Sequence, residues 1–192
     1  MKKMLLLTTL SLILLSCKEK KKNDFFPVLS FLQSQVKHVD TSVYNIQKIV
    51  PITDSTADTT SIPREQFRAE AADFLSIPDL TEGRFTDKYE QREGFEQEIN
   101  RAILSYYPKA GSKNLEIIRQ DVVIIPTTTG NDQVRTLFID RIKEYKDSTV
   151  LQKLFWTTDE SFKVLNIVQK TGQPDRVSQK ELVWNRPLEE KE

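Results

Sequence analysis

The feature that most constrains this chain is a succession of strand patterns joined by short turns in its carboxy-terminal half. Apolar and β-branched residues gather into runs of about nine to twelve residues, with turn-forming clusters between them. A short turn returns the chain alongside the strand that it has just left, so consecutive strands must pair antiparallel. The pattern predicts strands at Leu115–Ile125, Val134–Tyr145, Thr149–Thr157, Phe162–Lys170 and Val177–Asn185.

A first amphipathic helix is predicted ahead of these strands. Asn23 or Asp24 is placed to cap it, and Pro27 falls in its first turn, where proline is tolerated. Apolar residues then recur at helical spacing as far as about His38. A short strand is predicted next, at Tyr44–Val50.

A loop and a second helix follow. Residues 54–61 form a Thr, Ser and Asp cluster without apolar periodicity, which favours a loop. Thr60 or Ser61 is then placed to cap a helix that has Pro63 in its first turn and ends before Pro78. One face of this helix carries Phe67, Ala71, Phe74 and Leu75.

Residues 95–107 are compatible with a helix or a strand, because their apolar residues fit helical spacing and many of them are also strand formers. We favour a strand at Ile99–Tyr107. The turn-forming cluster at 108–112 would join it as a hairpin to the strand at Leu115–Ile125.

These elements predict an α+β domain, with amphipathic helices packed on a curved antiparallel β-meander of about six or seven strands. Both faces of several strands mix apolar and polar residues, so we expect the face opposite the helices to be partly covered by a loop, a ligand or a partner. Trp156 and Trp184 each fall near the end of a strand. We interpret them as core or rim aromatic residues, the alternative being that they line a binding groove.

The amino terminus has the composition of an export signal. Lys2 and Lys3 precede an apolar run, Met4–Leu15, which is too short to span a bilayer and is followed by the charged stretch 18–22. The residues Leu14, Leu15, Ser16 and Cys17 resemble the lipobox of bacterial lipoproteins.

This resemblance implies cleavage after Ser16 and attachment of diacylglycerol to the sulfur of Cys17. Two or three acyl chains give stable membrane anchoring, whereas one alone is marginal. The chain then divides into a signal peptide (1–16), a lipidated cysteine with a charged tether (17–23), one globular domain (24–186) and a charged tail (187–192). Lys18 stands where an aspartate would retain an enterobacterial lipoprotein at the inner membrane. We therefore expect the outer membrane, with the domain facing the periplasm or the cell surface.

Composition argues against several functions. The 28 basic residues balance 28 acidic ones, which gives no field to attract nucleic acid. His38 is the one histidine and Cys17 the one cysteine, so triad-type nucleophilic catalysis and a histidine-rich metal site lack their residues. The five glycines form no nucleotide-binding motif, and we expect no cofactor. An acidic cluster is more typical of solvated surface than of glycosidase chemistry; it comprises Glu90, Glu93, Glu96 and Glu98.

Three short motifs resemble the Asp, Ser/Thr acceptor used for O-glycosylation of exported proteins in some Gram-negative bacteria. Their acceptors are Ser55, Thr59 and Ser148, all in predicted loops. Turn-forming residues alone also produce such motifs.

We therefore expect a membrane-anchored envelope lipoprotein whose domain binds or scaffolds and does not catalyse. The alternative is a carrier of a hydrophobic ligand or lipid, because the predicted architecture is similar to the half-barrel domains of lipoprotein-sorting and lipid-shuttling proteins. That similarity concerns the fold alone. A third interpretation, an envelope hydrolase, lacks the necessary histidines.

Replacing Cys17 by Ser tests the anchor. The variant has no thiol to acylate, so it should move from the membrane fraction to the soluble fraction when cells are fractionated. Membrane residence equal to that of the unchanged protein would contradict the lipoprotein prediction.

Overall fold

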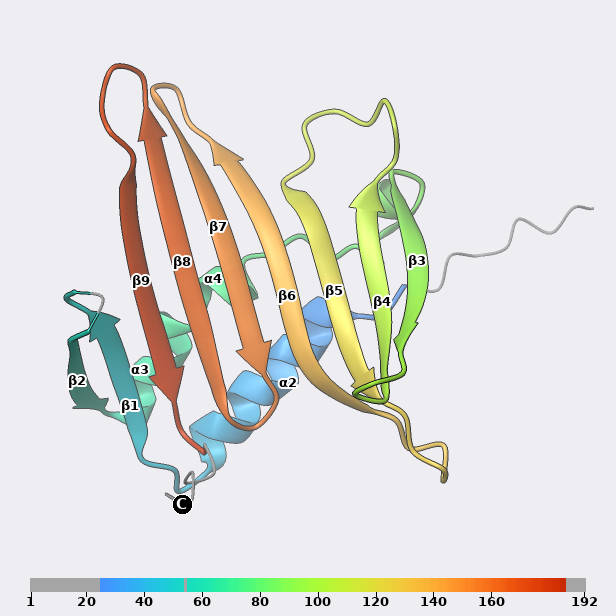
Figure 1. The fold of residues 1–192 in the computed structure, drawn as a ribbon, viewed down its shortest axis with the longest axis horizontal. Helices are drawn as coiled ribbons and strands as arrows, with labels where there is room; N and C mark the ends of the chain where they lie inside the picture. The colour runs from blue at the N-terminus through green and yellow to red at the C-terminus, as the bar shows by residue number, and fades with distance from the viewer. Residues whose placement is uncertain (1–24, 54, 186–192) are drawn as a thin grey trace, which may run out of the picture.

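The protein forms one antiparallel sheet of nine strands with helices against one face, in a computed structural model that describes residues 25–53 and 55–185 (Figure 1). The strand order is β2-β1-β9-β8-β7-β6-β5-β4-β3. The strands are β1 (Ile46–Pro51), β2 (Ala57–Ile62), β3 (Tyr89–Glu96), β4 (Arg101–Pro108), β5 (Ile117–Ile125), β6 (Gln133–Glu144), β7 (Ser148–Thr157), β8 (Ser161–Lys170) and β9 (Arg176–Val183). The helices are α2 (Val28–Thr41), α3 (Arg64–Glu70), α4 (Ala72–Leu75) and α5 (Gly83–Thr86).

Seven consecutive strands, β3 to β9, form a meander in which each pairs antiparallel with the next, and all of them except β3 correspond to predicted strands. The turns between them have the backbone that their residues favour. Gly172, between β8 and β9, has a φ of 75°, a left-handed conformation that costs glycine little. The hairpin of β1 and β2 then extends the sheet, because β1 pairs with β9 through Gln47 and Val183.

The expectation of six or seven strands was an undercount, and the two missed strands are the two edges of the sheet. β2 occupies most of the segment predicted as the loop 54–61, and its residues are exposed except for Ile62. In β3 the burial falls from Tyr89 to a solvent-exposed second half. An edge strand has one partner and little buried surface, so it needs no alternation of apolar residues.

The strand predicted for Ile99–Tyr107 is confirmed. β4 covers Arg101–Pro108 and pairs with both β3 and β5. The turn cluster after it connects β4 to β5, as expected for a hairpin.

The first predicted helix is confirmed as α2, which continues past His38 to Thr41. The predicted cap is wrong, because the N-cap position is taken by Pro27, which was expected in the first turn, and not by Asn23 or Asp24; these two residues lie outside the described part of the chain. Its buried face consists of predicted positions: Val28, Leu32, Val36 and Val39.

The second helix differs from the prediction in two ways. Thr60 and Ser61 belong to β2, so neither caps α3, and Pro63 takes the N-cap position without a side-chain hydrogen bond. The helix is also divided, since Ala71 has a ψ of 4° and separates α3 from α4. The short helix α5 was not predicted.

Aromatic side chains dominate the core between the helices and the sheet. Phe67 of α3 and Phe74 of α4 are fully buried, and their rings lie edge-on to Trp156 of β7, with centroids 6.3 and 5.1 Å away. Trp156 also stacks on Phe162 of β8 and lies 5.4 Å from the ring of Trp184. Contacts of this kind add to the gain from burial, so this cluster fixes α3 and α4 to the sheet.

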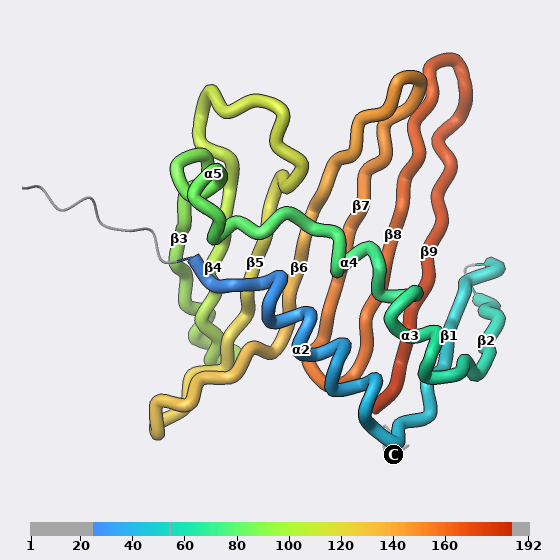
Figure 2. Tube along the Cα trace, turned by 180° about the vertical axis from the view of Figure 1, so that it is seen from behind, coloured from blue at the N-terminus to red at the C-terminus, as the bar shows by residue number. Residues whose placement is uncertain are grey.

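Helix α2 runs obliquely across the same face of the sheet (Figure 2). Before it begins, Phe25 packs edge-on against Tyr106 of β4, with ring centroids 5.0 Å apart. The Tyr106 hydroxyl accepts a hydrogen bond of 3.0 Å from the backbone N–H of Phe26. The start of α2 is thereby tied to the β4 side of the sheet.

The substitution Phe74→Ala should destabilise the fold by about 3–5 kcal/mol, because it leaves a cavity in this cluster. Urea unfolding monitored by tryptophan fluorescence measures the change. Phe95→Ala is the matched control, since Phe95 is 56% exposed, and it should change the free energy of unfolding by less than about 0.5 kcal/mol. Equal effects of the two substitutions would contradict this description of the core.

Candidate functional site

The second face of the sheet is the largest feature that the core does not use. Helices α2, α3 and α4 all lie behind the sheet in Figure 1 and in front of it in Figure 2. Within residues 25–53 and 55–185, no helix covers the opposite face, which we call the open face. Because side chains alternate along a strand, every strand of the sheet contributes residues to it.

Two rows of side chains cross the open face at the centre of the sheet. In one row, Arg119 of β5, Asp140 of β6 and Lys153 of β7 lie directly opposite one another. The neighbouring row runs through five strands, with residues paired in register. Its members are Asp121, Phe138, Phe155, Lys163 and Glu181.

A depression of about 360 Å³ lies where these rows cross β4 to β7. Four charged residues line it, namely Arg119, Asp121, Asp140 and Lys153. The other six lining residues are apolar: Ile103, Val123, Phe138, Ile139, Leu154 and Phe155. Small-molecule sites commonly combine an apolar lining with a few polar groups in this way.

Asp121 is the most buried charged group of the depression. Its side chain is 4% exposed, and its Oδ2 lies 2.5 Å from Nη2 of Arg119. Its Oδ1 is closed to solvent and has no hydrogen-bond partner among the described residues. The hydrogen bond to Asp121 raises the pKa of Arg119, whose guanidinium lies 6.0 Å from the ring of Tyr107. Asp121 thereby fixes the position of Arg119, whose side chain is about half exposed.

A second depression, of about 290 Å³, lies beside the first on β7 to β9. Phe155 lines both depressions. The second one also contains Thr157, Lys163 and Glu181, and the Lys163 Nζ lies 3.6 Å from the Glu181 Oε2. The two depressions therefore form one interrupted groove across the strands.

An aromatic pair lines the first depression, and one of its members, Phe155, also lines the second. Phe138 and Phe155 face each other across β6 and β7, with ring centroids 5.2 Å apart and an interplanar angle of 87°. Phe138 is 37% exposed, a large value for a phenylalanine in the middle of a sheet. The site thus offers an aromatic surface beside charged groups of both signs.

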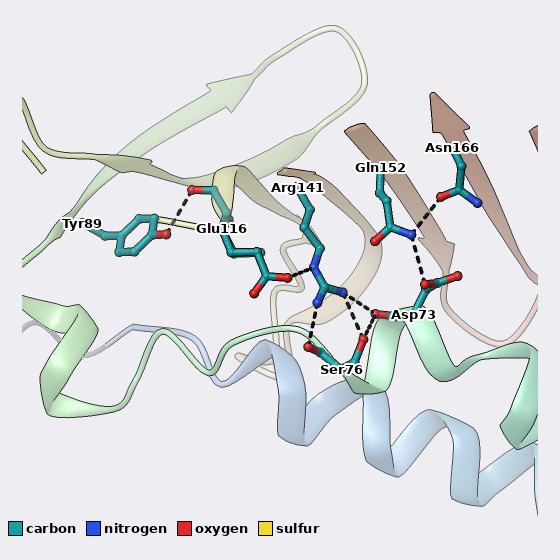
Figure 3. Close-up of polar contacts among 8 residues, drawn as sticks. Asp73, Ser76, Tyr89, Glu116, Arg141, Gln152 and Asn166 are labelled. Atoms are coloured by element: carbon teal, nitrogen blue, oxygen red, sulfur yellow. Dashed lines mark hydrogen bonds and ion pairs between the residues drawn. The ribbon is translucent and has the colours of Figure 1, made fainter. Parts of the chain in front are cut away.

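The polar network on the helix face has a structural role. Arg141 is buried and pairs with Glu116, while its guanidinium donates to the Ser76 hydroxyl at 3.0 Å and to the backbone carbonyl of Asp73 at 3.1 Å (Figure 3). Gln152 donates to the Asp73 carboxylate at 3.0 Å. A buried charge requires such partners, and here they attach the end of α4 to the sheet.

A second charged cluster attaches α3. Glu70 accepts hydrogen bonds from Lys48 of β1, at 2.6 Å, and from Lys180 of β9, at 2.8 Å. Burial alone raises the pKa of Glu70, but the hydrogen bonds and charges of the two lysines outweigh it, so the pKa of this carboxyl is lowered. These contacts hold a helix in place and leave no free group for chemistry.

The site residues predicted from the sequence lie elsewhere. Trp156 and Trp184 are 0% and 5% exposed and belong to the core, as the first interpretation expected, so they line no groove on the open face. Ser55 is exposed beyond β1. Thr59 lies within β2 and Ser148 begins β7, so these two acceptors are in strands and not in the loops predicted for them. Ser16 and Cys17 lie outside the described residues.

The residues considered for catalysis do not converge. His38 is exposed, and its Nε2 lies 4.0 Å from Asp159 Oδ1 at the turn between β7 and β8. The acidic cluster is spread along β3 and the turn after it, with Glu90 bound to Arg92. In the described part of the chain, no group of three or more His, Cys, Asp or Glu residues is placed to hold a metal ion.

Sequence reasoning missed Arg119 and Asp121, although a signal was present. Both fall in the predicted strand Leu115–Ile125, two positions apart and therefore on one face. An acid–base pair on one face of a largely apolar strand indicates a surface that is not packed against the core.

Comparison with known proteins assigns no role to this site. No protein-family model, no curated protein and no solved structure matches this chain.

The lowered pKa of Glu70 predicts a pH-dependent effect of Glu70→Gln. A carboxyl with a lowered folded-state pKa stabilises the fold above its unfolded-state pKa, and this contribution is lost as the pH falls through the folded-state pKa. The variant should therefore be less stable at pH 7, by about 2 kcal/mol for charge-assisted hydrogen bonds, and the difference should vanish in acid.

Urea unfolding of both proteins from pH 7 down to pH 3 measures this. Glu98→Gln, at an exposed position of the β3–β4 turn, should have no effect at either pH. A stability difference for Glu70→Gln that stays constant with pH would contradict the role given to its charge.

Proposed function

We propose that this protein is a lipid-anchored envelope protein whose domain binds a ligand or partner through the open face of its sheet and catalyses no reaction. The observation that carries the proposal is the placement of all the packed helices on one face. An uncovered sheet face with apolar side chains and two depressions is the kind of surface that marks an interaction site.

The composition of the open face supports binding rather than simple exposure to water. When one face of an antiparallel sheet is simply exposed to water, the residues on that face are polar and alternate along each strand with the apolar residues of the core face. Here Phe138 and Phe155 stand in the middle of the face, next to Asp121, which is nearly fully buried. Covering the exposed aromatic surface with a ligand is favourable, because it removes apolar area from water.

The filled core argues against the carrier alternative. In a half-barrel carrier, the ligand cavity lies between the sheet and the helices. In this protein that space holds the aromatic cluster of Phe67, Phe74, Trp156, Phe162 and Trp184. The depressions lie on the opposite face, open to solvent.

The anchoring part of the proposal depends on the lipobox-like residues Leu14 to Cys17. Among the described residues, none of the helices has the length and apolar character needed to cross a membrane. Acylation of Cys17 would hold the domain at the bilayer through the charged tether that ends at residue 23.

Lysine reactivity tests whether a ligand or partner covers the open face when the protein is in the cell envelope. Lys153 is exposed in the first depression, so an acylating reagent such as N-hydroxysuccinimide acetate should modify it readily in the purified protein. In isolated envelopes we expect its modification, measured by mass spectrometry, to fall at least fivefold because a bound ligand or partner shields it.

Lys37 is the internal control, since it is exposed and belongs to α2, which lies on the face of the sheet opposite the open face. Its reactivity should be the same in both preparations. Equal modification of Lys153 in envelopes and in the purified protein would refute binding through the open face.

A further inference from the structure

We infer that the two depressions of the open face bind a neutral saccharide chain lying across strands β4 to β9. This inference rests on the proposed function and adds the chemical class of the ligand. Its support comes from the charge balance of the groove, the Arg119 side chain that Asp121 holds, the aromatic pair and the arrangement of the depressions.

The charges of the groove cancel. Three of its residues are cationic and three are anionic, and they alternate along the two rows. The cationic residues are Arg119, Lys153 and Lys163, and the anionic ones are Asp121, Asp140 and Glu181. A strongly charged ligand gains no net attraction from such a surface, whether it is a polyanion or a polycation. A neutral ligand with many hydrogen-bonding groups can instead form a hydrogen bond with each of these charged side chains.

Hydroxyl groups suit this pattern best, because each one both donates and accepts. The Arg119 and Lys153 side chains supply donors, and Asp140 supplies an acceptor beside them. Asp121 holds Arg119 in place through its Oδ2. Arg119, held in this way and about half exposed, presents its remaining N–H groups to a ligand hydroxyl.

The apolar part of the groove fits the carbon-bound hydrogens of sugar rings. Phe138 and Phe155 offer ring surfaces at an angle of 87° to each other, and Ile103 and Val123 extend the apolar lining on one side. A long alkyl chain fits less well, because the charged row from Arg119 to Lys153 interrupts the apolar surface. A ligand with both apolar faces and hydroxyl edges matches both kinds of lining.

The arrangement of the depressions points to a chain rather than to a single sugar. Each depression, of about 360 and 290 Å³, lies near the lower end of the usual size for small-ligand sites. They touch only at Phe155, and together they cross six adjacent strands, which corresponds to roughly 24 Å at the ordinary strand spacing. A linear oligomer fills both.

Saturation-transfer NMR on the full-length chain carrying Cys17→Ser tests the inference. The probes are three neutral oligosaccharides (cellohexaose, maltohexaose and chitotetraose), with dodecanoate as the hydrophobic comparison. We expect transfer from at least one saccharide and a dissociation constant that rises at least tenfold in Arg119→Met and in Phe138→Leu. Thermal unfolding establishes that each variant is folded.

Arg176→Met is the matched control, because Arg176 is exposed at the start of β9 and lines neither depression. Its affinity should equal that of the parent protein. Saccharide binding that survives both groove substitutions in folded variants would overturn the location of the site.

Absence of transfer from all three saccharides would overturn the ligand class, and transfer from dodecanoate alone would favour the carrier alternative in its place. Shielding of Lys153 in envelopes separates this failure from that of the proposed function. If Lys153 is shielded but no saccharide binds, only the ligand class is wrong. If Lys153 is unshielded, binding through the open face is itself wrong.

Discussion

The packing of Phe67 and Phe74 against Trp156 is the contact on which the rest of the molecule depends. It draws α3 and α4 onto one face of a sheet that is wide enough to be covered on both sides. The buried Arg141 and the Glu70 cluster then fix the same helices by directed polar contacts. Because apolar burial and charge pairing hold the helices on the same face, the open face remains uncovered by them and exposes both apolar and charged side chains.

That division explains how one strand serves two purposes. In β7, Gln152, Leu154 and Trp156 are buried beneath the helices, while the residues between them face the groove. Successive side chains of a strand point to opposite faces of the sheet, so only the backbone lies between the core residues and the groove residues. A substitution in the groove can therefore alter binding without entering the core, and the core can remain rigid beneath a surface that changes.

The sequence indicated the meander because its central strands have two neighbours and one buried face, which produces apolar runs between turn residues. It failed at β2 and β3, where a single neighbour and wide exposure remove that pattern. The groove could not be predicted, because Asp121, Phe138 and Phe155 come from three strands and meet only through the pairing register. The resemblance of Leu14 to Cys17 to a lipobox, in contrast, is a matter of consecutive residues and can be seen in the sequence alone.

The pairing of β1 with β9 joins positions 47 and 183, near the two ends of the described chain. Long-range pairing of this kind must wait for loop closure, so it is expected to form late in folding. During synthesis the hairpin of β1 and β2 emerges first and has no partner until the last strand appears. The edge strand of this hairpin, β2, is short and carries a charged Asp58, two features that disfavour pairing with another chain. The polar composition of β2, which kept it from being predicted as a strand, thus also disfavours aggregation of the nascent protein.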